Sequence, residues 1–168
     1  IVEERKKKPI ESIPDLVNII KKSKKKNPRK KINISTQTFQ AIRIFVNKEI
    51  SELIEGLIKA SQFLKSGGKL IVISFHSIED KIVKFFFTNF SEGKSRSSRY
   101  YPDSFKEKIL FENYRNKVIR PSNKEITVNK PSRSAKLRFA IRSKDDFFYP
   151  LDLKNKFLNY LELENKNV

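Results

Sequence analysis

The segment from Gly67 to Phe87 places the strongest constraint on the fold of this chain. A glycine pair is followed by a short, uniformly apolar run, the run ends in polar residues, and a helical pattern begins at once. This order is typical of a buried strand in an open α/β sheet, which carries side chains to the rim where ligands bind. The only histidine of the chain, His76, follows the predicted strand 69–75. We therefore expect any chemistry to lie near that rim.

Apolar periodicity predicts the elements around this strand. A long helix, broken once, is expected over 36–65, and the glycine pair ends it. The uniformly apolar strand predicts helices on both faces of the sheet, one of them over 78–90. Residues 135–142 predict a final antiparallel strand. The other expected elements are a helix starting near Ser12, short strands at 108–111 and 117–120, a helix capped at Ser122, and a helical tail over 145–168.

The charge of the chain indicates a polyanionic partner. The 168 residues include 37 Lys+Arg and 19 Asp+Glu, which gives a net charge of +18. Nucleic acid is the usual partner of so basic a protein. Codon bias toward lysine is an alternative explanation, but such bias would raise the number of glutamates as well. We therefore expect a nucleic acid to be the partner.

Composition also excludes several kinds of site. The chain has no cysteine, which excludes disulfides and thiolate metal ligands, and a single histidine argues against a zinc site. No run of eighteen apolar residues is present, so no membrane span is expected. Residues 1–30 lack the apolar core of a signal peptide, and a cytoplasmic location is the simplest interpretation.

Two common chemistries receive little support from the residue pattern. His76 and Asp80 supply two members of a Ser-His-Asp triad, with serines at 74 and 77. Because neighbouring side chains at a strand end point to opposite faces, we do not expect a nucleophile–base pair there. A structural histidine bonded to a backbone carbonyl is the competing interpretation. The four glycines form neither a P-loop nor a G-x-G-x-x-G motif, so no residue is predicted to hold an adenosyl cofactor.

Three motifs, in order, resemble the MraW/RsmH family. They are Phe-Gln-Ala-Ile-Arg-Ile-Phe-Val-Asn-Lys-Glu at 39–49, the segment at 67–87, and Ser-Arg-Ser-Ala-Lys-Leu-Arg at 132–138. Members of that family are S-adenosylmethionine-dependent methyltransferases that act on N4 of a cytosine in small-subunit (16S) ribosomal RNA, at the decoding centre. The resemblance implies an α/β fold, the C-terminal portion of a class I (Rossmann-like) methyltransferase sheet plus part of an all-α insertion domain.

The same resemblance implies a domain organisation and a departure. Residues 1–60 would be a partial, mostly helical insertion region, 61–145 the C-terminal part of the α/β domain, and 146–168 a tail. The family's glycine-rich cofactor loop and acidic ribose-binding residue are not found. The chain thus resembles the C-terminal part of such an enzyme. We expect S-adenosylmethionine to bind the complete enzyme but not this part alone, which would be inactive without the missing N-terminal half.

Site residues follow from the resemblance and from the charge pattern. The pocket wall would include Ser74, His76, Ser77 and Glu79, and no metal site is expected. Interleaved cations and aromatics over 91–103 suit stacking on bases; a surface loop is the alternative. For Arg43 the alternatives to RNA contact are a salt bridge to Glu49 or to an absent partner segment. For Ser134, Lys136 and Arg138 the alternative is the polar face of an edge strand. The expected RNA contacts are Arg43, Lys94, Arg96, Arg99, Arg133, Lys136 and Arg138.

Two further functions remain open from the sequence. A non-enzymatic, basic, ribosome-associated RNA-binding module would explain the charge. An interaction protein that pairs an exposed sheet edge with a partner strand is the other possibility. The strand at 69–75 is expected to be central in the intact sheet, so its edge is predicted to be unpaired in this chain and to favour aggregation.

Overall fold

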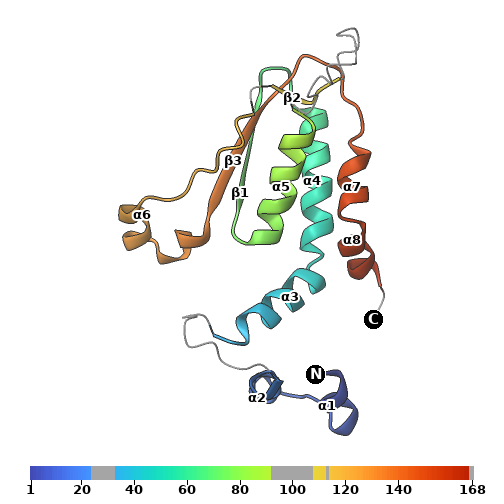
Figure 1. Ribbon diagram of the computed structural model, residues 1–168, viewed down its shortest axis with the longest axis vertical. Coiled ribbons are helices and arrows are strands. Elements are labelled where there is room, and N and C mark those ends of the chain that lie inside the picture. Colours follow the sequence, from blue (N-terminus) through green and yellow to red (C-terminus); the bar gives the residue numbers. More distant parts are fainter. Residues whose placement is uncertain (24–32, 92–107, 113, 167–168) are drawn as a thin grey trace, which may run out of the picture. The chain divides into compact units, whose positions relative to one another are not determined.

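The computed structural model shows a mixed α/β chain with a small antiparallel sheet (Figure 1). The chain divides into two compact units, Ile1–Glu49 and Ile50–Val168. The three-part division at residues 60 and 145 stays a prediction. The structure describes residues 1–23, 33–91, 108–112 and 114–166.

The first unit is helical. Its helices are α1 (Val2–Lys7), α2 (Ile13–Ser23) and α3 (Thr36–Val46). The hydroxyl of Ser12 accepts a hydrogen bond from the N–H of Asp15 (3.3 Å) and donates one to its carboxylate (2.6 Å). A serine in this position satisfies a backbone donor at the helix start, which is why α2 begins where the sequence predicts it.

The predicted break in the long helix is confirmed. The residues between α3 and α4 (Glu49–Phe63) include Lys48, whose φ of 50° is left-handed and ends the first helix. Arg43 spans the break, because its Nε lies 2.7 Å from Glu49 Oε1 and its Nη2 lies 3.0 Å from Oε2. This bidentate pair is the salt bridge that the sequence offers as the alternative to an RNA contact of Arg43.

The glycine pair joins the end of α4 to the sheet. Gly67 has a φ of 78°, a conformation that suits glycine after a helix. Its N–H donates to the carbonyl of Arg142 (2.9 Å), and the N–H of Arg142 donates to the carbonyl of Gly68 (2.8 Å). A Cβ on Gly68 would lie 2.8 Å from the carbonyl oxygen of Lys65. Both positions therefore require glycine, for different reasons.

The sheet has three strands in the order β1-β3-β2, and β3 is antiparallel to both neighbours. The final antiparallel strand predicted at 135–142 is thus confirmed. The predicted short strand at 117–120 contributes only an isolated bridge, in which Ile119 pairs with Leu137. The strands are β1 (Lys69–Ser74), β2 (Phe111–Glu112) and β3 (Lys136–Arg142).

One face of the sheet is covered by α5 (Ser77–Asn89), which packs against β1 and β3 (Figure 1). Phe86, Phe87 and Phe111 are fully buried there, and each pair of their rings has centroids less than 6 Å apart (5.9, 5.3 and 5.2 Å). Rings at these separations gain contact energy beyond the area they bury. This aromatic cluster forms the centre of the core.

The other face of the sheet is exposed in the described part of the chain. Ile71 lies opposite Phe139 in the register, so both side chains point to the same face. Ile71, Ile73 and Phe139 remain 57%, 55% and 45% exposed. The prediction of helices on both faces is therefore wrong for the described residues. The uniformly apolar sequence of β1 suggests that both faces of the sheet are covered, but the helices of the second unit cover only one of them.

Of the remaining helices, two come between β2 and β3 along the chain and two follow β3. The hydroxyl of Ser122 accepts a hydrogen bond from the N–H of Glu125 (3.2 Å), which confirms the predicted cap. The buried side chains of Leu153 and Phe157 anchor the C-terminal segment, and the Phe157 ring meets that of Phe85 edge-on at 5.6 Å. These elements are α6 (Asn123–Val128), the 3₁₀ helix η1 (Lys130–Ser134), α7 (Leu151–Lys156) and α8 (Leu158–Asn165).

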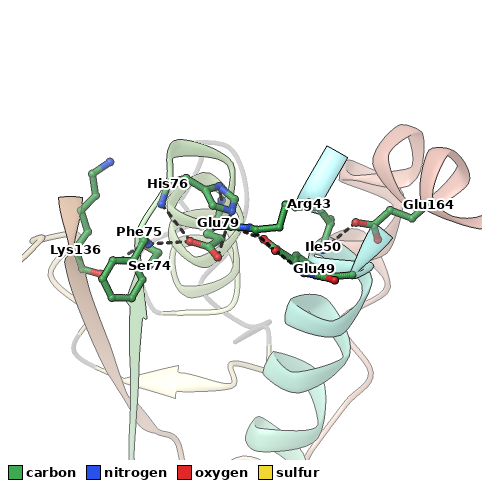
Figure 2. Close-up of polar contacts among 10 residues, drawn as sticks. Arg43, Glu49, Ile50, Ser74, Phe75, His76, Glu79, Lys136 and Glu164 are labelled. Carbon is green, nitrogen blue, oxygen red and sulfur yellow. Dashed lines mark hydrogen bonds and ion pairs between the residues drawn. The ribbon is translucent and has the colours of Figure 1, made fainter. Parts of the chain in front are cut away.

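Glu164 of α8 caps the start of α4. Its carboxylate accepts hydrogen bonds from the N–H of Ile50 (3.0 Å), the N–H of Ser51 (2.8 Å) and the Ser51 hydroxyl (2.5 Å). A carboxylate at this point satisfies backbone donors and interacts favourably with the helix dipole. Figure 2 shows the Glu164 side chain directed at Ile50.

Replacing Glu164 with alanine is expected to lower the free energy of unfolding by about 1–2 kcal/mol, the usual cost of losing a helix cap. Urea denaturation followed by circular dichroism would measure it. Glu162→Ala is the matched control, because Glu162 is exposed on the same helix. Equal midpoints for the two variants would contradict a capping role.

Candidate functional site

The turn from β1 to α5 forms the rim predicted to carry the chemistry. His76 is the N-cap of α5, and its Nδ1 accepts a hydrogen bond from the N–H of Glu79 (3.3 Å). The Glu79 carboxylate reaches back, and Oε2 accepts from the N–H groups of Phe75 (2.8 Å) and His76 (3.1 Å). Figure 2 shows this carboxylate turned toward the backbone of the rim. The two side chains thus form a reciprocal capping box.

This arrangement gives His76 and Glu79 a structural role. Because Nδ1 accepts a hydrogen bond, the neutral ring carries its proton on Nε2, which lies 3.2 Å from Glu79 Oε1. The competing interpretation from the sequence is a structural histidine bonded to a backbone carbonyl, whereas the ring here accepts from a backbone N–H. The spacing His-x-x-Glu at the end of a strand was the available signal, since it matches the positions of a capping box.

Ser74 and Ser77 occupy the two sides of the same turn. Ser74 is buried at the last position of β1, opposite Lys136, and its hydroxyl donates to the carbonyl of Lys136 at a long 3.4 Å. Ser77 is exposed at the first position of α5. The structure therefore brings the four pocket-wall candidates together in one turn. Their contact with a substrate stays a prediction.

An ion-pair cluster joins the start of α5 to the start of β3. Asp80 Oδ2 lies 2.9 Å from Lys136 Nζ, and Oδ1 lies 2.8 Å from Arg138 Nε. Arg138 Nη1 also donates to the hydroxyl of Tyr114 (3.2 Å) and to Oδ1 of Asn116 (3.3 Å). The Arg138 side chain is only 7% exposed and that of Asp80 15%. These side chains form a hydrogen-bonded polar network whose central groups, Asp80 and Arg138, are charged.

The cluster shifts the pKa values of its members. Burial tends to raise the pKa of Asp80, but the hydrogen bonds from Arg138 and Lys136 together outweigh burial, so the pKa lies below its ordinary value. Burial likewise tends to lower the pKa of Arg138, and its bonds to Asp80 and Tyr114 outweigh that effect and raise it. Both groups are therefore charged at neutral pH.

The predicted RNA-contacting residues have different surroundings. Arg43 is paired with Glu49, in agreement with an alternative offered by the sequence. Lys136 and Arg138 are paired with Asp80, and their strand β3 is the central one of the sheet, so the alternative of a polar face on an edge strand is wrong. Arg133 is exposed on η1. RNA contact by these residues stays a prediction. Lys94, Arg96 and Arg99 lie outside the described residues.

The sequence analysis missed Arg142, the last residue of β3. Its guanidinium is buried and donates to the carbonyls of Ser61 (3.0 Å), Leu110 (3.2 Å), Ser143 (3.2 Å) and Asp145 (2.9 Å), and to the Ser143 hydroxyl (2.8 Å). The bonds connect α4, the segment before β2 and the turn after β3. No local pattern marks such a residue, because its partners come from three separate segments.

The absence of an adenosyl-cofactor site from this part of the chain stays a prediction. Such a site needs a carboxylate free to bind ribose hydroxyls, as in nucleotide-binding α/β folds. At the rim, the Glu79 carboxylate is committed to the backbone. A hollow among the helices of residues 1–49 is lined by apolar side chains with Arg5 and Lys6, and no carboxylate of the described residues lines it.

Among the described helices, none has the length and apolar character needed to cross a membrane.

Comparison with known proteins places the chain in a family. The sequence profile described as the MraW methylase family matches residues 1–143. Proteins named ribosomal RNA small subunit methyltransferase H are similar: that of Ehrlichia chaffeensis is 45% identical over 142 residues, and that of Agrobacterium fabrum 40% over 143. These alignments cover 84% and 85% of this chain but only 45% and 42% of the relatives' lengths, so the chain spans less than half of the relatives it matches. The chain belongs to the MraW methylase family.

Proposed function

We propose that the chain is the acceptor-side part of a methyltransferase that transfers a methyl group from S-adenosylmethionine to N4 of a cytosine in small-subunit ribosomal RNA. The observation that carries the proposal is the family match over residues 1–143, together with relatives named as ribosomal RNA small subunit methyltransferases. A net charge of +18 suits an RNA substrate.

The open sheet supports a larger α/β domain of the class I methyltransferase type. β1 lies at an edge of the three-stranded sheet, and the face of Ile71, Ile73 and Phe139 is exposed. An apolar edge and face of this kind favour further strands and a covering helix. The part of the relatives' length that this chain does not span would supply them. In that arrangement residues 1–60 belong to a helical insertion and 61–145 to the sheet domain.

The residues of this chain would contribute the wall of the acceptor pocket. Methylation of an exocyclic amine needs the base out of its stack, close alignment of the reacting atoms, and an acceptor for a proton. Ser74 and Ser77 lie on the rim, whose shape is fixed by the capping box of His76 and Glu79. These residues hold the wall in place, while the donor site belongs to polypeptide beyond this chain.

Reconstitution tests the proposal. The N-terminal part of the Ehrlichia chaffeensis relative, ending where its similarity to this chain begins, would be produced separately and mixed with the chain. We expect labelled methyl groups to be transferred to unmodified small-subunit ribosomal RNA only when both parts are present. Micromolar binding of labelled S-adenosylmethionine by the chain alone, measured by equilibrium dialysis, would contradict the division of labour.

A basic RNA-binding module without catalysis is the second candidate, and the net charge favours it. It predicts RNA binding that weakens with salt, and no methyl transfer even with the complementary part present. The same experiment thus separates the two functions. For a valid negative result, co-purification of the two parts must show that they associate.

A further inference from the structure

Residues 115–134, here called the basic arm, leave the sheet after β2 and return to it at β3 (Figure 1). They include six cations and one carboxylate, Glu125, a net charge of +5 in twenty residues. Every one of the six is exposed. Among the described residues, none of the six is within ion-pair distance of a carboxylate. The six are Arg115, Lys117, Arg120, Lys124, Lys130 and Arg133.

The cations beside the arm differ from those of the arm because they are paired with a carboxylate or buried. Lys136 and Arg138, at the start of β3, are held by Asp80 at 2.9 and 2.8 Å. Arg142, at the end of the same strand, is buried among carbonyl groups. A cation that is already paired must lose its partner before it neutralises a phosphate, whereas an exposed, unpaired cation loses only counterions and water. The arm therefore presents charge that is available to a polyanion.

The arm is fixed to the second unit at its base. Ile119 and Leu137 exchange two backbone hydrogen bonds, each of 2.9 Å. Asn116 accepts a hydrogen bond from Arg138, the residue that Asp80 also holds. These bonds hold the first five residues of the arm, and its other end continues into β3, so the cations project from a defined point of the sheet.

That point adjoins the rim. η1 leads within two residues into β3, whose first residue, Lys136, lies opposite Ser74 in the register. Ser74 is the last residue of β1, immediately before the turn that carries His76 and Glu79. An RNA strand that lies along the basic arm would therefore approach the proposed wall of the acceptor pocket.

We propose that the basic arm binds the phosphate backbone of the RNA substrate and directs it toward the rim, an inference that rests on the proposed function. The arm has no aromatic residue on which a base could stack. Its contacts are ionic, so they position the RNA without reading its sequence. RNA is preferred to another polyanion because the relatives are named for ribosomal RNA and because the arm ends beside the wall.

The test compares two variants with the same change in charge. The arm variant combines Lys117→Gln, Arg120→Gln, Lys124→Gln and Lys130→Gln. The control combines Lys59→Gln, Lys65→Gln, Lys84→Gln and Lys156→Gln, which are exposed lysines elsewhere in the second unit. All eight side chains are exposed, so we expect the urea midpoint to be unchanged in both variants.

Binding would be measured by fluorescence anisotropy with a labelled decoding-centre hairpin of small-subunit ribosomal RNA, from about 50 to 300 mM salt. For the arm variant we expect Kd to rise more than about tenfold at the lowest salt, and the slope of log K against log salt to fall by about 3. For the control we expect less than about a threefold change. Equal losses in the two variants would overturn the proposal, because they would indicate net charge alone.

Two further outcomes separate this proposal from the proposed function. Unchanged RNA binding by the arm variant, with methyl transfer intact after reconstitution, overturns the arm and leaves the methyltransferase function standing. Absence of both RNA binding and methyl transfer in the unmodified, reconstituted protein overturns the function itself. Tighter binding of the unmodified chain to anionic phospholipid vesicles than to the hairpin, with equal loss in the arm variant, would assign the arm to a membrane surface instead.

Discussion

Replacing Arg142 with methionine is expected to lower the free energy of unfolding of the chain by about 3–5 kcal/mol. The guanidinium donates five hydrogen bonds to Ser61, Leu110, Ser143 and Asp145 in a buried setting. Methionine fills a similar space but donates none, so four carbonyl groups and a hydroxyl lose a donor. Each buried polar group left without a partner costs about 1–3 kcal/mol before relaxation.

Urea denaturation followed by circular dichroism measures this effect. Arg142→Lys is an informative second variant, because it keeps the charge but cannot reach three separate segments with one ammonium group. We expect it to lose most of the same stability. Arg115→Met is the matched control, since Arg115 is exposed and its replacement should change stability by less than about 0.5 kcal/mol. Loss of less than about 1 kcal/mol in Arg142→Met would show that the network contributes little.

Replacing Asp80 with asparagine is expected to lower the free energy of unfolding by about 2–3 kcal/mol at pH 7. The change keeps the size of the side chain but leaves two cations, Lys136 and Arg138, without their counter-charge. Breaking a fully buried pair costs about 3–5 kcal/mol and an exposed one about 0–1 kcal/mol. The partial exposure of Lys136 places this cluster between the two cases.

The effect of Asp80 should depend on pH in a defined direction. Because the folded state lowers the pKa of Asp80, the carboxylate stabilises the fold above its unfolded pKa of about 4. That stabilisation is lost as the pH falls from about 5 through the lowered, folded-state pKa. The stability difference between the unmodified chain and Asp80→Asn should therefore be full at pH 6–7 and shrink below about pH 4.

Urea titrations at a series of pH values from about 3 to 7 would measure this difference. Asp146→Asn is the control, because Asp146 is an exposed carboxylate, and its difference from the unmodified chain should stay near zero throughout. A difference for Asp80→Asn that is constant with pH would contradict the role assigned to its charge.

Local signals in the sequence predict much of this fold. The apolar run after the glycine pair predicts β1 to within one residue, and Ser12 and Ser122 mark the starts of two helices. The antiparallel β3 and a single break in the helix over 36–65, but not the position of that break at Lys48, also follow from short stretches of sequence. Each of these features depends on residues a few positions apart, so the pattern contains the information needed to predict it.

The site is less predictable than the fold. The predicted strand also locates the turn that carries Ser74, His76 and Glu79. The sequence analysis does not predict that the side chains of His76 and Glu79 form a capping box. The charge pattern predicts an RNA-binding protein without distinguishing paired from available cations. The pairing of Lys136 and Arg138 with Asp80 depends on the position of α5 across two strands. The availability of the basic arm is therefore a tertiary property.

By itself, the sequence determined the family, the basic character, the strand-turn-helix of the rim and the glycine pair that precedes it. Only the tertiary structure decided which polar groups are paired with other groups of the protein. Arg138 meets Asp80 across 58 positions, Arg142 meets Ser61 across 81, and Glu164 meets Ser51 across 113. The reason is physical: strand register and helix packing bring such groups together, and neither is encoded within a window of neighbouring residues.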